Sequence, residues 1–539
     1  MRRLALLGLA TALLTGFAGP SGAVGLAGPG GAAEETPRRE ERRYDTFVVE
    51  HVRVPMRDGV ELAADIYRPV TPARVRVPVI LQLTPYHSLY KSLDPNEADL
   101  PVGDAKLFVP QGYAYVVADV RGTWGSGGCW DYGGLKERQD GYDLVEWLGT
   151  RAWSNGKVAM TGASYDGTTA NAAAVEAPPH LATIVPISAI SRWWGYAYQQ
   201  GARASYSGTS ADIDPPSDTP TDFMFGYGFL PPPDPSTVTN AQQIAMRWTL
   251  CDRIRQTEHG YDLEPDYDDF WVERDYLRLA ARVKVPVLIS HGLLDFNVKT
   301  WEGTSWYSAL RTEKAMVLGQ WPHASPRGKY PEWNEFLTKW YERWLYGVRN
   351  GVEHEPPVRV QSSDREWRSG EWGRTRPRVL PLAGPSVTIV DDGALEEEQM
   401  LRGVGRDARF VRVPVPRSDG PLHLQGRPVL RLAFASDRAS TQLDAVLCDV
   451  GPDGVCRIVS RAYLNARYLH GLTAGKDLVP GETYVAALEF IDKDYIVAEG
   501  RHLELLISSA STTWVAPDDS RARNTLQLDR SSLVLPVVR

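Results

Sequence analysis

Three side chains that lie far apart in the sequence have the types that nucleophilic acyl transfer requires: Ser164, Asp295 and His323. A serine is a weak nucleophile until a base takes its proton. An imidazole is suited to that task, and a carboxylate fixes the imidazole tautomer and stabilises the imidazolium. The order serine, aspartate, histidine therefore predicts a catalytic triad.

Ser164 lies in residues 162–167, Gly-Ala-Ser-Tyr-Asp-Gly, which are related to the Gly-x-Ser-x-Gly pattern of a nucleophile elbow. In an elbow a strand turns sharply into a helix, and the glycines leave room for the turn while the serine hydroxyl stays exposed. The helix begins behind the serine with its positive dipole end toward the reacting centre. We therefore expect the backbone N–H of Tyr165 to donate to the developing oxyanion.

The other two triad residues follow apolar runs that have strand character. Residues 285–290 precede Asp295 and residues 315–319 precede His323, as expected for side chains at the carboxyl ends of strands. Taken alone, Asp295 is equally well explained as a helix N-cap and His323 as a surface histidine. The elbow and the two strand ends together favour catalysis.

Strand-like runs alternate with helical stretches through residues 45–352. The strand-like runs are residues 47–54, 60–67, 77–83, 113–119, 156–161, 182–188, 285–291 and 314–319, and the helical stretches include 138–150, 165–176 and 300–311. This alternation predicts an α/β fold, namely the doubly wound sheet of an α/β-hydrolase. Between residues 191 and 280 the pattern becomes irregular, with a helical stretch at 241–255, which predicts a helical cap insertion over the strand tips.

From residue 353 onward short alternating strands and turn sequences replace the helices, which predicts an all-β sandwich. A length of 539 residues also implies more than one domain. The expected division is a signal peptide at 1–23, a flexible leader at 24–44, an α/β-hydrolase domain at 45–190 and 281–352, a cap insertion at 191–280 and a C-terminal β-sandwich at 353–539.

The N-terminal residues have the three parts of a secretory signal peptide. Met1-Arg2-Arg3 is followed by an apolar run over residues 4–18 and then by Ser21-Gly22-Ala23, with cleavage expected after Ala23. The run is short for a membrane-spanning helix. We therefore expect a secreted, extracellular bacterial protein without stable membrane association, and a retained membrane anchor is the alternative.

Four cysteines agree with export. Cys448 and Cys456 flank the turn sequence 451–454, which would fold two strands together and bring the two thiols near each other. For Cys129 and Cys251 a second disulfide and two free thiols stay equally open, because separation in the sequence does not fix their distance.

Composition argues against several other classes of protein. Hydrophobic residues make up 43% of the chain and aromatic residues 10%, which excludes wholesale disorder. The net charge of −8 provides no basic face, so we expect no nucleic acid partner. No Cys-His cluster has zinc spacing and no P-loop or dinucleotide fingerprint occurs, so we expect no metal and no cofactor in the mechanism.

Several stretches of the sequence match one known family. They are residues 56–60, 65–69, 84–86, 119–122, 162–167, 266–271, 273–276 and 291–299. In these stretches the chain resembles the serine peptidase family of X-prolyl dipeptidyl peptidases, with cocaine esterase and the α-amino acid ester hydrolases as relatives. The resemblance implies a C-terminal jelly roll packed on the hydrolase domain.

The same resemblance implies that the hydroxyl of Tyr86 is the second oxyanion donor. Residues 81–84 read as a strand end, from which a phenol can reach the developing charge. The alternative is an ordinary half-buried tyrosine.

The branch of the family is indicated by the residues after Asp295. α-Amino acid ester hydrolases carry acidic residues two and three places after the catalytic aspartate, where this chain has Asn297 and Val298. The string 291–299 instead resembles the prolyl peptidases. The favoured function is therefore that of a secreted serine hydrolase that releases N-terminal Xaa-Pro dipeptides through an acyl-enzyme on Ser164.

An X-Pro exopeptidase needs a flat apolar slot for the pyrrolidine ring and an acceptor for the α-ammonium group of the substrate. The candidates for the slot are Trp193, Trp194 and Tyr198. The candidate acceptor is Asn297 together with Asp212 or Asp214, although acids in a loop are more commonly only solvated.

Two other functions stay open at this point. The same triad serves an esterase or amidase of the cocaine esterase type that acts on small acyl esters, because ester and amide hydrolysis share the acyl-enzyme route. A C-terminal sandwich would also suit an inactive surface or carbohydrate-binding protein. The expected partner is thus a proline-containing peptide or a small acyl ester.

Overall fold

The computed structural model describes residues 42–86, 103–204, 265–323, 325–403, 407–417, 420–518 and 520–539. The predicted signal peptide at 1–23, the helical stretch at 241–255 and most of the cap insertion therefore lie outside the described residues. The described parts of the cap region are α5 (Trp193–Ala197), β7 (Tyr198–Gln199), β8 (Ala202–Arg203), α8 (Asp269–Glu273) and the 3₁₀ helix η4 (Tyr276–Arg282).

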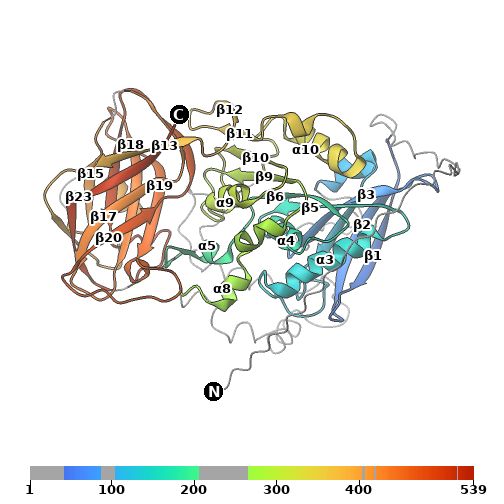
Figure 1. Ribbon diagram of the computed structural model, residues 1–539, viewed down its shortest axis with the longest axis horizontal. Coiled ribbons are helices and arrows are strands. Elements are labelled where there is room, and N and C mark those ends of the chain that lie inside the picture. The colour runs from blue at the N-terminus through green and yellow to red at the C-terminus, as the bar shows by residue number, and fades with distance from the viewer. Residues whose placement is uncertain are drawn as a thin grey trace, which may run out of the picture. The chain divides into compact units, whose positions relative to one another are not determined.

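A ten-stranded sheet forms the centre of the first domain (Figure 1). In spatial order its strands are β1 (Phe47–Pro55), β2 (Glu61–Pro69), β4 (Ala114–Asp119), β3 (Val77–Thr84), β5 (Ser154–Ala163), β6 (Leu181–Ile187), β9 (Val287–Gly292), β10 (Lys314–Gly319), β11 (Val358–Gln361) and β12 (Trp367–Gly370). The strands from β4 to β11 are parallel, whereas β1, β2 and β12 pair antiparallel with their neighbours. The parallel strands are continuous apolar runs because both of their faces are covered.

Helices cover both faces of this sheet. Along β3, Val79 and Leu81 enter one apolar cluster and Ile80 enters another, as the two-residue period of a strand requires. The first cluster includes residues of α3 (Leu135–Gly149), α4 (Tyr165–Ala174) and α9 (Trp301–Ala309), and the second includes residues of α2 (Ala105–Phe108) and α10 (Trp333–Tyr341). Figure 1 shows α3 and α4 on one side of the central strands and α10 on the other. The predicted doubly wound α/β-hydrolase sheet is thus confirmed.

The domain boundary predicted at residue 353 is wrong. Strand β11 pairs in parallel with β10, and β12 pairs with β11, so the hydrolase sheet continues to Gly370. Short alternating strands reveal that a segment is extended, but they do not reveal which sheet it joins. The first domain also contains three short helices, which are the 3₁₀ helix η2 (Val109–Gln111), the π-helix η5 (Glu342–Tyr346) and the 3₁₀ helix η6 (Val352–His354).

The C-terminal domain is all-β and contains two sheets. The larger sheet comprises β13 (Thr375–Pro381), β14 (Val387–Val390), β16 (Leu422–Gly426), β17 (Val429–Ser436), β20 (Thr483–Glu489), β21 (Lys493–Val497) and β23 (Arg523–Val538). The smaller sheet comprises β15 (Phe410–Pro414), β18 (Gln442–Val450), β19 (Cys456–Asn465) and β22 (His502–Ser508), and α11 (Glu397–Arg402) and η7 (Ala466–Tyr468) complete the domain. Residues from both sheets share one apolar core.

One predicted disulfide is present. Cys448 and Cys456 are bonded across the turn between β18 and β19, as the turn sequence between them indicated. Cys129 is also disulfide-bonded, while Cys251, its candidate partner, lies outside the described residues. Within the described ranges no helix has both the length and the apolar character needed to span a bilayer.

Candidate active site

Ser164 occupies a strained turn between β5 and α4. Its backbone torsions are φ 63° and ψ −124°, which lie in a region that residues other than glycine rarely adopt. A Cβ atom on Gly162 would meet the Cβ of Asp166 at 2.2 Å, and a Cβ on Gly167 would meet the carbonyl oxygen of Gly162 at 2.7 Å. Both glycines are therefore required by close approach, and the elbow predicted from the sequence forms at Ser164.

The two predicted oxyanion donors lie beside Ser164. The Tyr86 hydroxyl is 3.4 Å from Ser164 Oγ, and the backbone of Tyr86 is fixed because its N–H donates to Thr84 Oγ1 at 2.9 Å. Tyr165 is the first residue of α4, where a backbone N–H has no carbonyl of its own helix to bond. A phenol and an amide thus lie next to the nucleophile, as an oxyanion hole requires.

Asp295 and His323 meet across the ends of β9 and β10, which are parallel neighbours. His323 Nδ1 lies 2.7 Å from Asp295 Oδ2. Because an ionised carboxylate only accepts hydrogen bonds, Nδ1 carries the proton and Nε2 is left to take the proton of the serine. The other carboxylate oxygen of Asp295 accepts from the backbone N–H of Val298 at 2.9 Å, which closes the loop after β9.

Asp295 is fully buried. Burial alone would raise the pKa of Asp295, but attraction by His323 and hydrogen bonds from His291 and His323 outweigh burial and lower the pKa to about 2. The carboxylate is therefore ionised at neutral pH, and it can stabilise an imidazolium formed during the reaction.

In the described part of the chain no hydrogen bond joins Ser164 Oγ to His323, and the hydroxyl of Ser164 bonds Tyr86 instead. Catalytic hydrogen bonds are often long before substrate binds and shorten in the reacting complex. Substrate binding therefore has to bring Ser164 Oγ into hydrogen-bond contact with His323.

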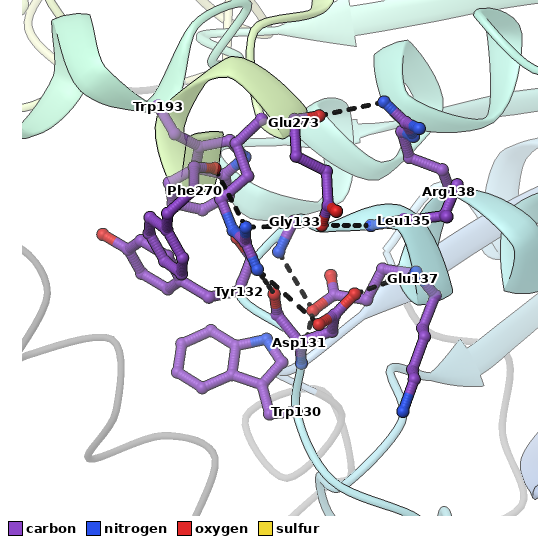
Figure 2. A network of polar contacts seen from close by, with 12 residues as sticks. Trp130, Asp131, Tyr132, Gly133, Leu135, Glu137, Arg138, Trp193, Phe270 and Glu273 are labelled. Carbon is purple, nitrogen blue, oxygen red and sulfur yellow. Dashed lines mark hydrogen bonds and ion pairs between the residues drawn. The ribbon is translucent and has the colours of Figure 1, made fainter. Parts of the chain in front are cut away.

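Behind the nucleophile, the side chain of Tyr165 anchors the elbow to a buried carboxyl group. The Tyr165 hydroxyl donates to Glu137 Oε2 and accepts from Trp130 Nε1, both at 2.6 Å. Glu137 Oε1 accepts from the backbone N–H groups of Asp131 at 3.0 Å and Gly133 at 3.1 Å (Figure 2). One carboxyl group thus connects the residue after the nucleophile with the loop before α3.

Arg274 holds the same loop from the other side. Its guanidinium donates to the carbonyl oxygens of Asp131 at 2.8 Å and Tyr132 at 3.0 Å. The ring of Tyr132 in turn lies 4.4 Å from that of Trp193, and Figure 2 shows these rings gathered beside the polar contacts. The support of the elbow is therefore both polar and aromatic.

Burial, followed by the proximity of Asp131, raises the pKa of Glu137 to about 8, although hydrogen bonds from Tyr165 and Gly133 oppose the shift. The folded protein therefore holds the proton of Glu137 more firmly than the unfolded chain does. No sequence signal identified this residue, because an acid in the first turn of a helix is ordinary.

The structure does not bring Trp193 and Trp194 together as the walls of one slot. Trp193 is fully buried, and its indole N–H donates to the hydroxyl of Tyr276 at 3.0 Å. The indole N–H of Trp194 donates to the carbonyl of Pro265 at 2.9 Å. The predicted slot between the two rings is wrong because consecutive residues of a helix point about 100° apart. Trp194 instead lines a cavity of about 310 Å³ together with Tyr198.

Asn297 lies two residues after Asp295, and its side-chain oxygen accepts a hydrogen bond from the Tyr196 hydroxyl at 3.1 Å. An amide oxygen has two lone pairs, so Asn297 can still accept from an ammonium group. Its proposed companions Asp212 and Asp214 lie outside the described residues. In the described ranges no three His, Cys, Asp or Glu side chains group as metal ligands would.

Comparison with known proteins gives two matches to family profiles. Residues 58–325 match the profile of X-Pro dipeptidyl-peptidase (S15 family), and residues 405–534 match that of the X-Pro dipeptidyl-peptidase C-terminal non-catalytic domain. A Bacillus anthracis protein named "Putative Xaa-Pro dipeptidyl-peptidase" is 27% identical over 537 residues, which cover 90% of this chain and 85% of the relative.

Cocaine esterase of Rhodococcus sp. (strain MB1 Bresler) is 25% identical over 538 residues, which cover 86% of this chain and 91% of the esterase. Among solved structures, a CocE/NonD family hydrolase from Staphylococcus aureus superposes with a TM-score of 0.71 at 18% identity, covering 91% of this chain and 94% of that one. The structural similarity supports the fold.

Replacing Tyr86 with Phe should lower kcat by roughly two to three orders of magnitude while KM changes little, because one of two oxyanion donors is lost. Steady-state kinetics on any substrate that the wild type turns over would measure the effect. Ser164→Ala, which should be inactive with an almost unchanged thermal midpoint, sets the background. A Tyr86→Phe enzyme with wild-type kcat would show that the hydroxyl does not contact the transition state.

Glu137→Gln should remove a pH dependence of stability. The pKa of Glu137 is raised in the folded protein, so its contribution to stability is complete below the unfolded value of about 4.5 and is lost as pH rises through about 8. Urea denaturation at pH 5 and pH 8.5 should show a smaller loss of unfolding free energy in Glu137→Gln than in the wild type. Equal losses in both proteins would contradict the shifted pKa.

Proposed function

Because the chain belongs to the family of X-Pro dipeptidyl-peptidases and cocaine esterase, and is a serine hydrolase, we propose that it releases N-terminal Xaa-Pro dipeptides through an acyl-enzyme on Ser164. One observation carries this proposal. At the carboxyl ends of the parallel strands Tyr86 lies beside Ser164, and His323 is hydrogen-bonded to Asp295.

The first half of the reaction forms an ester on the enzyme. Ser164 Oγ attacks the carbonyl carbon of the proline residue while His323 Nε2 takes the hydroxyl proton. The negative charge moves to the carbonyl oxygen, which the Tyr86 hydroxyl and the Tyr165 N–H stabilise. The C–N bond then breaks, and His323 returns the proton to the leaving amine.

The second half releases the dipeptide. Water attacks the acyl group on Ser164, with His323 again as the base, and the serine leaves with its proton restored. Throughout both halves Asp295 stays ionised and holds Nδ1 of His323 in the productive tautomer, since its pKa lies near 2.

The preference for peptides is supported by Asn297. An exopeptidase must recognise a free ammonium group, and the amide oxygen of Asn297 is oriented by Tyr196 only two residues from the catalytic acid. An uncharged acceptor of this kind suits an ammonium group, with a carboxylate from elsewhere completing the site.

An esterase of the cocaine esterase type is the second candidate. The similarity to cocaine esterase extends over most of both chains, and the triad by itself treats esters and amides alike. The lining of the acyl pocket separates the two functions, so a substrate panel is the decisive experiment.

Ala-Pro linked to a chromogenic amine should be cleaved, whereas its N-acetylated counterpart should react roughly 5- to 150-fold more slowly, because leaving buried acceptors unpaired costs roughly 1 to 3 kcal/mol. Initial rates on both compounds and on a butyrate ester test this. Efficient hydrolysis of the ester without release from Ala-Pro amides would contradict the peptidase and favour the esterase.

We also propose that the protein is exported and cleaved after Ala23. The charged, apolar and small-residue order of residues 1–23 supports this, as does the disulfide between Cys448 and Cys456, a bond that persists in oxidising compartments. Mass spectrometry of protein recovered from the culture medium should give a mature chain starting at Val24. Protein that stays in the cell and retains Met1 would contradict export.

A further inference from the structure

Strand β21 of the C-terminal domain contacts both loops that carry triad residues. The ammonium group of Lys493 donates to the carbonyl oxygen of Leu293, two residues before Asp295. The backbone carbonyl of the next residue, Asp494, accepts from the side-chain amide of Gln320 at 3.2 Å, three residues before His323. Two consecutive residues of one strand therefore touch the loop of the catalytic acid and the loop of the catalytic base.

Lys493 is buried in a place where a lysine is costly. Only 4% of its surface is exposed, and it forms no ion pair with a carboxylate of the described residues. Burial, assisted by repulsion from Arg461, lowers the pKa of Lys493 to about 7, while Asp295 and Asp492 act in the opposite direction. Groups in such environments concentrate at functional sites.

The side chain next to the catalytic acid is held by the same domain. Phe296, between Asp295 and Asn297, has its ring 5.3 Å from that of Trp514 and 4.3 Å from the guanidinium of Arg461. The ammonium of Lys493 lies 5.0 Å from the Phe296 ring. The loop is thus fixed on both sides of Asp295, through the Leu293 carbonyl before it and the Phe296 ring after it.

The neighbouring acid is already engaged by other groups. Asp492 accepts from Arg427 at 2.7 Å and from the hydroxyl of Thr304. Lys493 is therefore not needed as the counter-ion of Asp492, and its direct hydrogen bond goes to the loop of the triad.

We propose that Lys493 is a positioning residue of the active site: it holds residues 293–296 against the C-terminal domain so that Asp295 meets His323 in the geometry that catalysis requires. The proposal rests on the acyl-enzyme mechanism proposed above, and it is independent of whether the substrate is a peptide or an ester. It assigns a role in turnover to a domain whose family profile is described as non-catalytic.

The test replaces Lys493 with Met, which has a similar length but neither charge nor donor. We expect kcat per active site to fall about 10- to 100-fold, as a displaced catalytic group does, with KM within about twofold of the wild type. Active sites are counted by titration with a phosphonate that reacts with Ser164. Counting sites separates the two roles, because a merely structural lysine would change the thermal midpoint and the number of sites but not kcat per site.

Two further variants sharpen the result. Lys476→Met changes the other lysine of the same domain, which is exposed, and should leave kcat unchanged. Lys493→Arg keeps a charge and a donor and should recover part of the activity lost in Lys493→Met.

Wild-type kcat per site in Lys493→Met, or an equal loss in Lys476→Met, would overturn the proposal. If Lys493→Met does not fold, Phe296→Leu loosens the same loop from the same domain, and an unchanged kcat per site in that variant would overturn it as well. Retained activity in Ser164→Ala would refute the proposed mechanism itself and is thereby distinguished from a failure of the role of Lys493.

Discussion

The buried carboxylate of Asp295 is the constraint that the rest of the site satisfies. An ionised group removed from water costs several kcal/mol unless charges and donors compensate it. Here His323, His291 and the backbone of Val298 provide that compensation, and they come from two adjacent strand ends and the loop between them. Because β9 and β10 are parallel neighbours, both loops leave the sheet at the same edge. The topology of the sheet is therefore what allows one charge to be buried and a base to be oriented by it.

The nucleophile imposes a second constraint, because the backbone of Ser164 is strained. A residue in such a conformation costs about 1 to 3 kcal/mol and persists only where its surroundings determine it. The Ser164 N–H donates to the carbonyl of Ile187 at 2.8 Å, which ties the turn to β6. The bonds from Tyr165 to Glu137 and Trp130 fix the other side. Glu137 thus helps to hold the backbone of Ser164 in its strained conformation, although the two residues do not contact each other.

Local sequence patterns predicted much of this architecture, and their failures have a common cause. The elbow and the alternation of strands and helices depend on residues that are close in sequence. The positions of the triad residues follow from the order of the strands along the chain. The prediction of a slot between Trp193 and Trp194 was wrong because the sequence shows that both residues are aromatic but not the direction in which each side chain points. The boundary at 353 failed because strand pairing is non-local. Glu137 and Lys493 carry no signal, since the partners that connect them to the site, Tyr165 and Leu293, lie 28 and 200 residues away.

The position of β23 in the larger C-terminal sheet has a consequence for the order of folding. This strand pairs with β13, β14, β16 and β17, all of which precede it in the chain. During synthesis those strands leave the ribosome without the partner that joins them, and their apolar faces cannot close around Leu526 and Leu533. Strand β21, which pairs with β16 in the same sheet, is also synthesised after the whole hydrolase sheet, so its contacts with the catalytic loops can form only late. The nascent hydrolase domain can therefore fold early, whereas its active site is completed late.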